Sequence, residues 1–155
     1  MFNIARKLKS QGVLGINHRN SDYALRYNAR SRYPLVDDKL KTKQLAMALG
    51  IPVPSLHATI SGEHQVKHIE SLLNEFDNFV IKPAHGAGGD GILVVTNRVF
   101  GRYRQINGAL LTLDDLKYHL SCLLAGAYSL SGHPDKALIE QRVIVDKTFE
   151  SISYE

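Results

Sequence analysis

The chain has 155 residues, 44% of them hydrophobic, and carries a formal net charge of +4 with an isoelectric point near 9.2. This length is typical of about one globular domain, and the basic balance favours anionic ligands without selecting one class. The single cysteine, Cys122, excludes an internal disulfide framework, and no apolar run is long enough to span a bilayer or form a signal peptide. We therefore expect a cytoplasmic protein with no membrane partner.

The first segment, residues 1–34, is predicted to be helical or irregular, and it ends in a cluster of interleaved arginines and tyrosines. Such a cluster could bind single-stranded nucleic acid through phosphate contacts and base stacking. The alternative is an amphipathic lid whose tyrosines pack down while its arginines stay in water, and we favour it. The residues concerned are Arg19, Arg26, Arg30, Arg32, Tyr23, Tyr27 and Tyr33.

A helix is predicted over residues 37–49, with Asp37 as its N-cap and Gly50 as its stop. Lys39 stands in the first turn, where its charge opposes the helix macrodipole. A phosphate bound there would resolve this conflict. Otherwise Lys39 and Lys43, one turn apart, form a solvated charged face.

The third region, residues 53–146, is predicted to be a small α+β unit. Asn107-Gly108 is a strong hairpin turn signal, and Thr112 with Asp115 resembles a capping box. The helix that follows has one apolar face, made of Leu113, Leu116, Leu120, Leu123 and Leu124. His133-Pro134-Asp135 is interpreted as a turn. The other expected elements are a strand at 53–60, a helix at 63–75, a strand pair over 79–96 and a last strand at 137–145.

The most informative stretch is FVIKPAHGAGGDGI, residues 79–92, in which a strand ending in Lys82 and Pro83 leads into four closely spaced glycines. Alternation places Phe79 and Ile81 on one strand face and Lys82 on the other. The glycines permit positive φ and a close approach of backbone N–H groups to an anion. A second strand follows the loop, so the connection is strand to loop to strand.

This order excludes three phosphate-binding motifs that resemble the stretch. A dinucleotide-binding fingerprint needs a helix after its glycines, and a Walker A loop needs Lys-Ser/Thr after the last one. The protein-kinase loop has its lysine on the strand that follows, whereas Lys82 precedes the glycines. An ordinary glycine-rich hairpin beside an exposed lysine remains the alternative.

The last strand, ALIEQRVIV, carries Glu140 and Gln141. An extended backbone beside an aromatic base can offer one C=O and one N–H to its edge, and polar side chains suit the mouth of such a pocket. A partly buried strand with one paired carboxylate is the alternative.

Taken in order, three segments resemble the ATP-grasp fold: VDDKLKTKQLAMALGIPVP, FVIKPAHGAGGDGILVV and ALIEQRVIV. The closest resemblance is to the alpha-L-glutamate ligase-like, or sugar-transferase-associated, ATP-grasp proteins. Two further stretches carry it, GINHRNSDYALRYNARSRYPLVDDK and SLSGHPDKALIEQRV. It implies a helical N-terminal segment, 1–52, and an α+β nucleotide-binding subdomain, 53–146, with a mainly antiparallel sheet and a glycine flap at 84–91.

The resemblance implies an ATP-dependent carboxylate–amine ligase that works through an acyl phosphate. Lys39 and Lys82 would contact ATP phosphates, and the loop would cover the β- and γ-phosphates. Asp146 or Glu150 is the candidate for the ribose. The residues implied at the nucleotide are Lys39, Lys82, His85, Gly86, Ala87, Gly88, Gly89, Gly91, Glu140, Gln141 and Val143.

In ATP-grasp enzymes the Mg²⁺ ligands, and the arginine that meets the reacting phosphate, lie beyond the hinge strand. The chain stops at Glu155, so we expect it to be the N-terminal part of a ligase, with 147–155 beginning a missing half and no catalysis by this part alone. Self-association is possible through the edge this would leave exposed. A nucleotide-binding module without chemistry is the second reading, and a basic nucleic-acid-binding protein is the third.

Overall fold

The computed structural model describes residues 2–129 and 132–149, and the chain divides into two compact units, residues 1–37 and 38–155. The helix that carries Lys39 and Lys43 therefore belongs to the same unit as the glycine loop.

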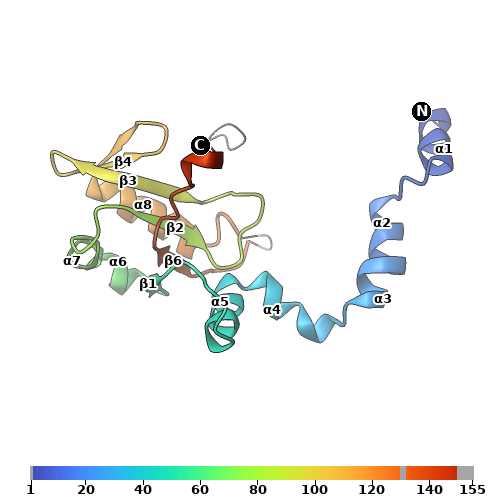
Figure 1. Ribbon diagram of the computed structural model, residues 1–155, viewed down its shortest axis with the longest axis horizontal. Helices are drawn as coiled ribbons and strands as arrows, with labels where there is room; N and C mark the ends of the chain where they lie inside the picture. The colour runs from blue at the N-terminus through green and yellow to red at the C-terminus, as the bar shows by residue number, and fades with distance from the viewer. Residues whose placement is uncertain (1, 130–131, 150–155) are drawn as a thin grey trace. The chain divides into compact units, whose positions relative to one another are not determined.

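The N-terminal unit consists of short helical pieces joined by turns (Figure 1). Taken by itself, it buries none of its side chains between residues 4 and 37. Tyr23 and Tyr27 lie exposed in it, with 49% and 71% of their surface accessible. The pieces are α1 (Phe2–Ser10), α2 (Ile16–Arg19), a π-type turn (Asn20–Ala24), α3 (Leu25–Tyr27), a 3-10 turn (Arg30–Arg32) and α4 (Pro34–Asp37).

The second unit is built on a six-stranded sheet with the order β1-β6-β2-β3-β4-β5. Every neighbouring pair is antiparallel, so the predicted α+β class with an antiparallel sheet is confirmed. The last strand of the chain lies between the first two. The strands are β1 (Leu56–Ile60), β2 (Phe79–Pro83), β3 (Leu93–Val99), β4 (Arg102–Gln105), β5 (Leu110–Leu111) and β6 (Ala137–Glu140).

The core lies on one face of this sheet, under α6 (Glu63–Val66), α7 (Ile69–Leu73) and α8 (Leu113–Leu124) (Figure 1). Phe79 and Ile81 of β2 are fully buried there, while Lys82 is not, as strand alternation predicts. The capping box at Thr112 is confirmed. The buried face of α8 consists of the predicted leucines Leu116, Leu120, Leu123 and Leu124, with Leu113 packed at its edge.

Several predicted boundaries are wrong. The predicted strand at 53–60 begins only at Leu56, since Pro54 has no backbone N–H to donate to a ladder. The helix α5 spans Lys39–Ala48, and its N-cap is Asp38, because Asp38 adopts an extended backbone and its carboxylate accepts the N–H groups of Leu40 and Lys41. Asp37 instead ends α4.

The predicted helix at 63–75 is two helices, α6 and α7, and Val66, Ile69 and Leu73 are buried across the break. The predicted strand at 137–145 stops at Glu140. Its last backbone hydrogen bond to the neighbouring chain segment is the one from the Gln141 N–H to the Ser55 carbonyl, at 2.8 Å. Residues 141–146 then run on without regular structure.

Candidate functional site

The sheet order brings Lys82 and Glu140 together on the face opposite the core. β6 pairs with β2 so that Val80 is opposite Glu140 and Lys82 is opposite Leu138. These four side chains therefore share one face. The Lys82 Nζ lies 2.6 Å from the Glu140 Oε2, and only 3% of Glu140 is exposed.

A second lysine reaches the same carboxylate from α5. The Nζ of Lys43 lies 3.2 Å from the Glu140 Oε1 and donates a hydrogen bond to the Pro54 carbonyl. Lys43 is 6% exposed, so the prediction that it belongs to a solvated face is wrong. A buried lysine needs a counter-ion, and Glu140 supplies it. Two cations thus share one carboxylate, which leaves this cluster with an excess positive charge.

One oxygen of this carboxylate has spare hydrogen-bonding capacity. The Lys43 contact to the Glu140 Oε1 is an ion pair by distance but lacks hydrogen-bond geometry, and Oε1 has no hydrogen-bond partner among the described residues. Buried polar atoms of this kind normally have a partner. Oε1 is enclosed by the protein, so the nearby Lys43 ammonium is the charge that offsets its burial.

The third lysine, Lys39, joins the first turn of α5 to the glycine loop. Its backbone N–H donates to the Ala84 carbonyl at 3.0 Å, and its Nζ donates to the Gly86 carbonyl. Partial burial, and to a smaller extent repulsion from Lys82, holds the pKa of Lys39 below its ordinary value of 10.5. The proximity of these two cations creates a positive field at the root of the loop, which a bound anion would offset.

The glycine loop is held at both ends. Gly86 forms an isolated antiparallel bridge with Ser129, and a Cβ there would lie 2.2 Å from the Pro83 ring. Gly91 has φ +74° and lies on the Tyr128 ring, where a Cβ would approach to 2.5 Å. These close approaches require glycine.

Between these anchors the loop opens to solvent. Gly88 and Gly89 adopt φ +66° and +86°, and a Cβ at either position would meet nothing within 4 Å. Ala87 is exposed as well. The loop therefore combines a fixed root with an uncovered tip, which is the arrangement that a flap over a ligand needs.

His85, at the start of the loop, is held in place by hydrogen bonds to the buried carboxylate of Asp135. Asp135 accepts the His85 backbone N–H at 2.9 Å and pairs with the ring Nδ1 at 2.7 Å. The same carboxylate also accepts the Lys136 N–H at 2.7 Å. Since a carboxylate only accepts, the ring proton lies on Nδ1. The half-exposed Nε2 lies 3.7 Å from an Asp38 oxygen and faces outward beside the loop.

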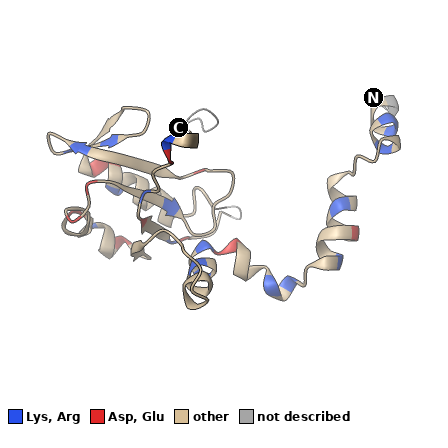
Figure 2. Ribbon diagram, in the orientation of Figure 1, with Lys and Arg blue, Asp and Glu red and all other residues tan. Residues whose placement is uncertain are grey.

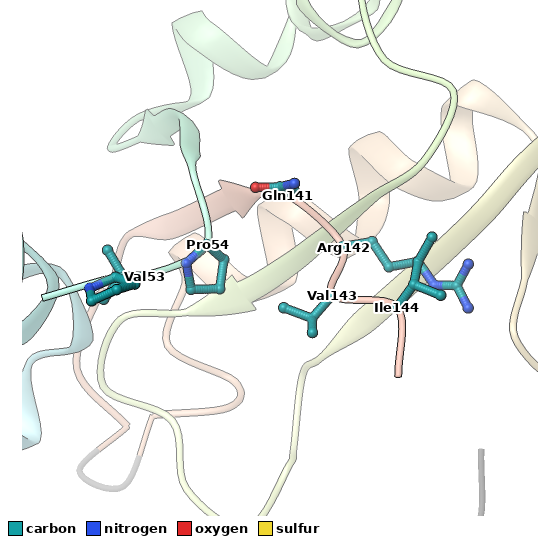
Figure 3. A pocket seen from close by; sticks show the side chains of 7 residues that line it. Val53, Pro54, Gln141, Arg142, Val143 and Ile144 are labelled. Atoms are coloured by element: carbon teal, nitrogen blue, oxygen red, sulfur yellow. The ribbon is translucent and has the colours of Figure 1, made fainter. Parts of the chain in front are cut away.

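A cavity of about 410 Å³ lies where the chain leaves β6 (Figure 3). The segment before β1 forms one wall and the segment after β6 forms the other. No described residue hydrogen-bonds to the backbone of Arg142, Val143 or Ile144, so this wall offers free N–H and C=O groups. The cavity is lined by Pro52, Val53, Pro54, Gln141, Arg142, Val143 and Ile144.

The lysine cluster and the cavity are adjacent in the structure. Glu140 is followed directly by the residues that line the cavity, and the Lys43 Nζ donates to the carbonyl of Pro54 on the opposite wall. The Gln141 Oε1 accepts the Ser55 N–H at 3.2 Å, which ties the two walls together. The charged cluster and the cavity thus lie next to each other in the structure.

The predicted site residues fall into three groups. Lys39 and Gly86 contact one another, Lys82 contacts Glu140, and His85 stands next to Gly86. Gln141 and Val143 line the cavity, whereas Glu140 lies behind it and binds lysines. Ala87, Gly88 and Gly89 form the open tip of the loop. Asp146 caps its own 3-10 turn by accepting from Thr148, and Glu150 lies outside the described residues.

Two partners of the site could not be assigned from the sequence. Lys43 was placed on a charged helix face, and Asp135 was interpreted as part of a turn. No sequence signal marks Lys43, because apolar residues normally form the packed face of a helix, whereas Leu45 and Met47 are exposed here and Lys43 is buried. Asp135 has no signal either, because its partner lies fifty residues away in sequence.

Among the described residues, no group of three or more His, Cys, Asp or Glu side chains is arranged to hold a metal ion. Nor does any helix in the described ranges have the length and apolar character needed to cross a membrane.

None of the curated proteins and none of the solved structures compared with the chain matched it. The family described as sugar-transfer associated ATP-grasp matches residues 18–155. This range includes α5, the glycine loop, β6 and the walls of the cavity. The chain belongs to the sugar-transfer associated ATP-grasp family, a group of ATP-binding, ligase-like proteins.

Proposed function

We propose that the chain is the nucleotide-binding part of an ATP-dependent carboxylate–amine ligase. The observation that carries this proposal is the convergence of Lys39, Lys82 and the root of the glycine loop beside an apolar cavity. Bound ATP supplies a phosphoryl group that turns a carboxylate into an acyl phosphate, whose carbonyl carbon an amine attacks with release of phosphate.

The phosphates are assigned to the positively charged end of the site. Lys39 and Lys82 provide two charge-assisted donors, and the open loop tip at Gly88 and Gly89 provides backbone N–H groups that need no side-chain movement. Lys43 is too deeply buried for a direct contact and instead holds Glu140, which in turn orients Lys82.

The adenine is assigned to the cavity behind Glu140. Its volume, about 410 Å³, lies within the range of small-molecule sites, and its walls are mainly prolines and aliphatic side chains, with Gln141 and Arg142 as the polar members. The free backbone groups of Arg142, Val143 and Ile144 suit the hydrogen-bonding edge of the base. The Gln141 N–H is already bonded to Ser55, so we do not assign it to the base.

Mg²⁺ accompanies ATP in this family, but the described residues do not form a site that fits it. We therefore assign no residue of this chain to the metal and derive no step through it. The roles proposed here are binding and orientation of the nucleotide by the lysines, the loop and the cavity.

Titration calorimetry with ATP and with adenosine tests the assignment. Lys39→Ala and Lys82→Ala should each weaken ATP binding by roughly 10- to 100-fold, since each removes a charge-assisted contact, and should leave adenosine binding nearly unchanged. Lys117→Ala, on the far helix α8, is the matched control. Equal ATP affinity in all three variants would refute the phosphate site.

Ligase chemistry needs a separate measurement. The wild-type chain would be incubated with ATP, Mg²⁺, hydroxylamine and glutamate or another amino acid, so that an acyl phosphate is trapped as a hydroxamate. Hydroxamate that disappears in Lys82→Ala supports the ligase reaction. ATP binding without hydroxamate or ADP would identify this chain as a nucleotide-binding module without chemistry.

A further inference from the structure

The positive charge of the protein is concentrated in its N-terminal unit. Residues 1–37 contain seven Lys and Arg and two Asp, a net charge of +5, whereas the other residues contain twelve Lys and Arg and thirteen Asp and Glu, a net charge of −1. No acidic residue precedes Asp22. Figure 2 shows blue segments spaced along these helices. The lysines, the loop and the cavity of the nucleotide site all belong to the other unit.

The same unit leaves its apolar side chains without an internal core. Helix α1 carries Ile4 and Leu8 one turn apart on one face, with Arg6 on the opposite face and Lys7 and Lys9 flanking the apolar face on either side. The residues after α1 are also apolar and accessible. The exposed fractions are 67% for Ile4, 44% for Leu8, 51% for Val13, 39% for Leu14 and 69% for Ile16.

A groove runs between α1 and these residues. It encloses about 650 Å³ and is lined mainly by small and aliphatic side chains, with Lys9 and His18 as its polar members. A nine-residue helix with no buried side chain from residue 4 onward is marginal in water by itself. It needs a partner that takes up aliphatic side chains and also carries negative charge.

Two features separate this surface from the nucleotide-binding module. It lies in the first compact unit, and residues 2–17, including α1, precede the range that matches the ATP-grasp family. Contact with a nucleic acid backbone gives exposed aliphatic side chains no favourable free energy of burial, whereas entering the acyl boundary of a bilayer does. Lysines beside them gain from anionic headgroups.

We infer that α1 and residues 13–16 dock on the surface of an anionic membrane, with the aliphatic face in the acyl boundary and the flanking Lys7 and Lys9 at the lipid phosphates. The expectation of no membrane partner rested on the lack of a spanning segment, which has no bearing on surface docking. This inference does not depend on the proposed function.

Vesicle co-sedimentation of the full chain tests the docking. The chain should bind vesicles of phosphatidylcholine mixed with phosphatidylglycerol and not vesicles of phosphatidylcholine alone, with binding that weakens steeply as salt rises. The helical signal in circular dichroism should increase on binding. Equal binding to both kinds of vesicle, or no binding to either at low salt, would overturn the inference.

Matched variants locate the contact. K7Q/K9Q should weaken binding to the anionic vesicles by roughly 10- to 30-fold, because two charges are removed from the surface, whereas K67Q/K117Q should not. I4N/L8N should weaken binding as well, whereas I106N/L110N, which changes two exposed apolar residues of the β4–β5 hairpin, should not. Docking through this helix would be contradicted if the control pairs lost as much vesicle binding as the α1 variants. Wild-type vesicle binding by I4N/L8N would contradict it as well.

Two controls keep these outcomes interpretable. The α1 variants should unfold at the same temperature as wild type, because α1 contributes no buried side chain from residue 4 onward. Binding to single-stranded RNA and to duplex DNA oligonucleotides is measured in parallel. Nucleic acid binding without vesicle binding would overturn membrane docking and identify nucleic acid as the anionic partner of this surface.

Discussion

At the scale of single residues, the candidate site depends on one buried carboxylate between two lysines. Glu140 holds Lys43 and Lys82 in place, and neither contact can be inferred from the neighbours of these residues in sequence. A buried ion pair contributes little net stability compared with an apolar pair, but losing one member is costly. Glu140 therefore determines both the position of Lys82 and the stability of the sheet around it.

Replacing Glu140 by Gln should destabilise the protein by about 3–5 kcal/mol, because Lys43 would stay buried without its counter-ion. Urea denaturation of the variant beside Glu70→Gln, an exposed glutamate on α7, measures this loss. A Glu140→Gln variant as stable as the control would mean that Lys43 is hydrated or neutral in the folded protein.

His119 predicts a pH dependence of stability. Burial lowers its pKa below the ordinary value of 6.5, and the hydrogen bond between Nε2 and the Gly91 carbonyl, at 3.1 Å, only partly opposes this. As pH falls below about 6.5, His119 becomes protonated in the unfolded chain but stays neutral in the folded chain. The free energy of unfolding therefore decreases. Stability is lost between this value and the lowered pKa.

The measurement is chemical denaturation across this pH range. His119→Gln should flatten the slope of unfolding free energy against pH, whereas His68→Gln, an exposed histidine, should not. An unchanged slope in His119→Gln would assign the pH dependence to other groups.

At the scale of elements, the glycine loop is anchored at its two ends and open at its tip. The Tyr128 ring packs against Gly91, and the centroid of the His119 ring lies 5.4 Å from the centroid of the Tyr128 ring. Helix α8 and the residues after it thus position the second end of the loop. The glycines have two different roles: close packing at Gly86 and Gly91, and backbone freedom at Gly88 and Gly89.

Alanine substitutions separate these roles. Gly89→Ala should cost about 1–2 kcal/mol, the cost of positive φ for a residue with a Cβ. Gly91→Ala should cost about 1–3 kcal/mol more, because its Cβ also overlaps the Tyr128 ring. Thermal or urea unfolding compares the two variants directly. Equal losses would show that the loop moves away from Tyr128 without resistance.

At the scale of the whole molecule, the two units differ in what holds them together. The second unit has a core in which Phe79, Ile81, Leu116 and Leu120 are fully buried between sheet and helices. The first unit forms short helices with no buried side chain from residue 4 to 37. Packing supplies most of the stability of a helix in a protein, so the first unit should open far more readily.

Native-state hydrogen exchange tests this difference in the absence of any ligand or membrane. Amides of residues 2–37 should exchange with little protection, whereas those of β2, β6 and α8 should approach the protection expected for global unfolding. Strong protection in α1 or α3 would show that these helices pack against another part of the protein.

Local features of the sequence determined much of this protein. Strand alternation placed Lys82 on the face away from the core, the capping box began α8 at Leu113, and glycine spacing located the loop. Each of these depends on contacts within a few residues, where backbone geometry and hydrogen bonding act alone.

Only the tertiary structure decided which groups share the site. The insertion of β6 between β1 and β2 brought Glu140 to Lys82, turned the lysine face of α5 inward to bury Lys43, and set Asp135 beside His85. Local propensity cannot specify these contacts, because they join residues tens of positions apart and their energy comes from burying charge. The sequence alone therefore predicted a phosphate-binding loop, and the packing of the sheet and α5 determined the charged groups around it.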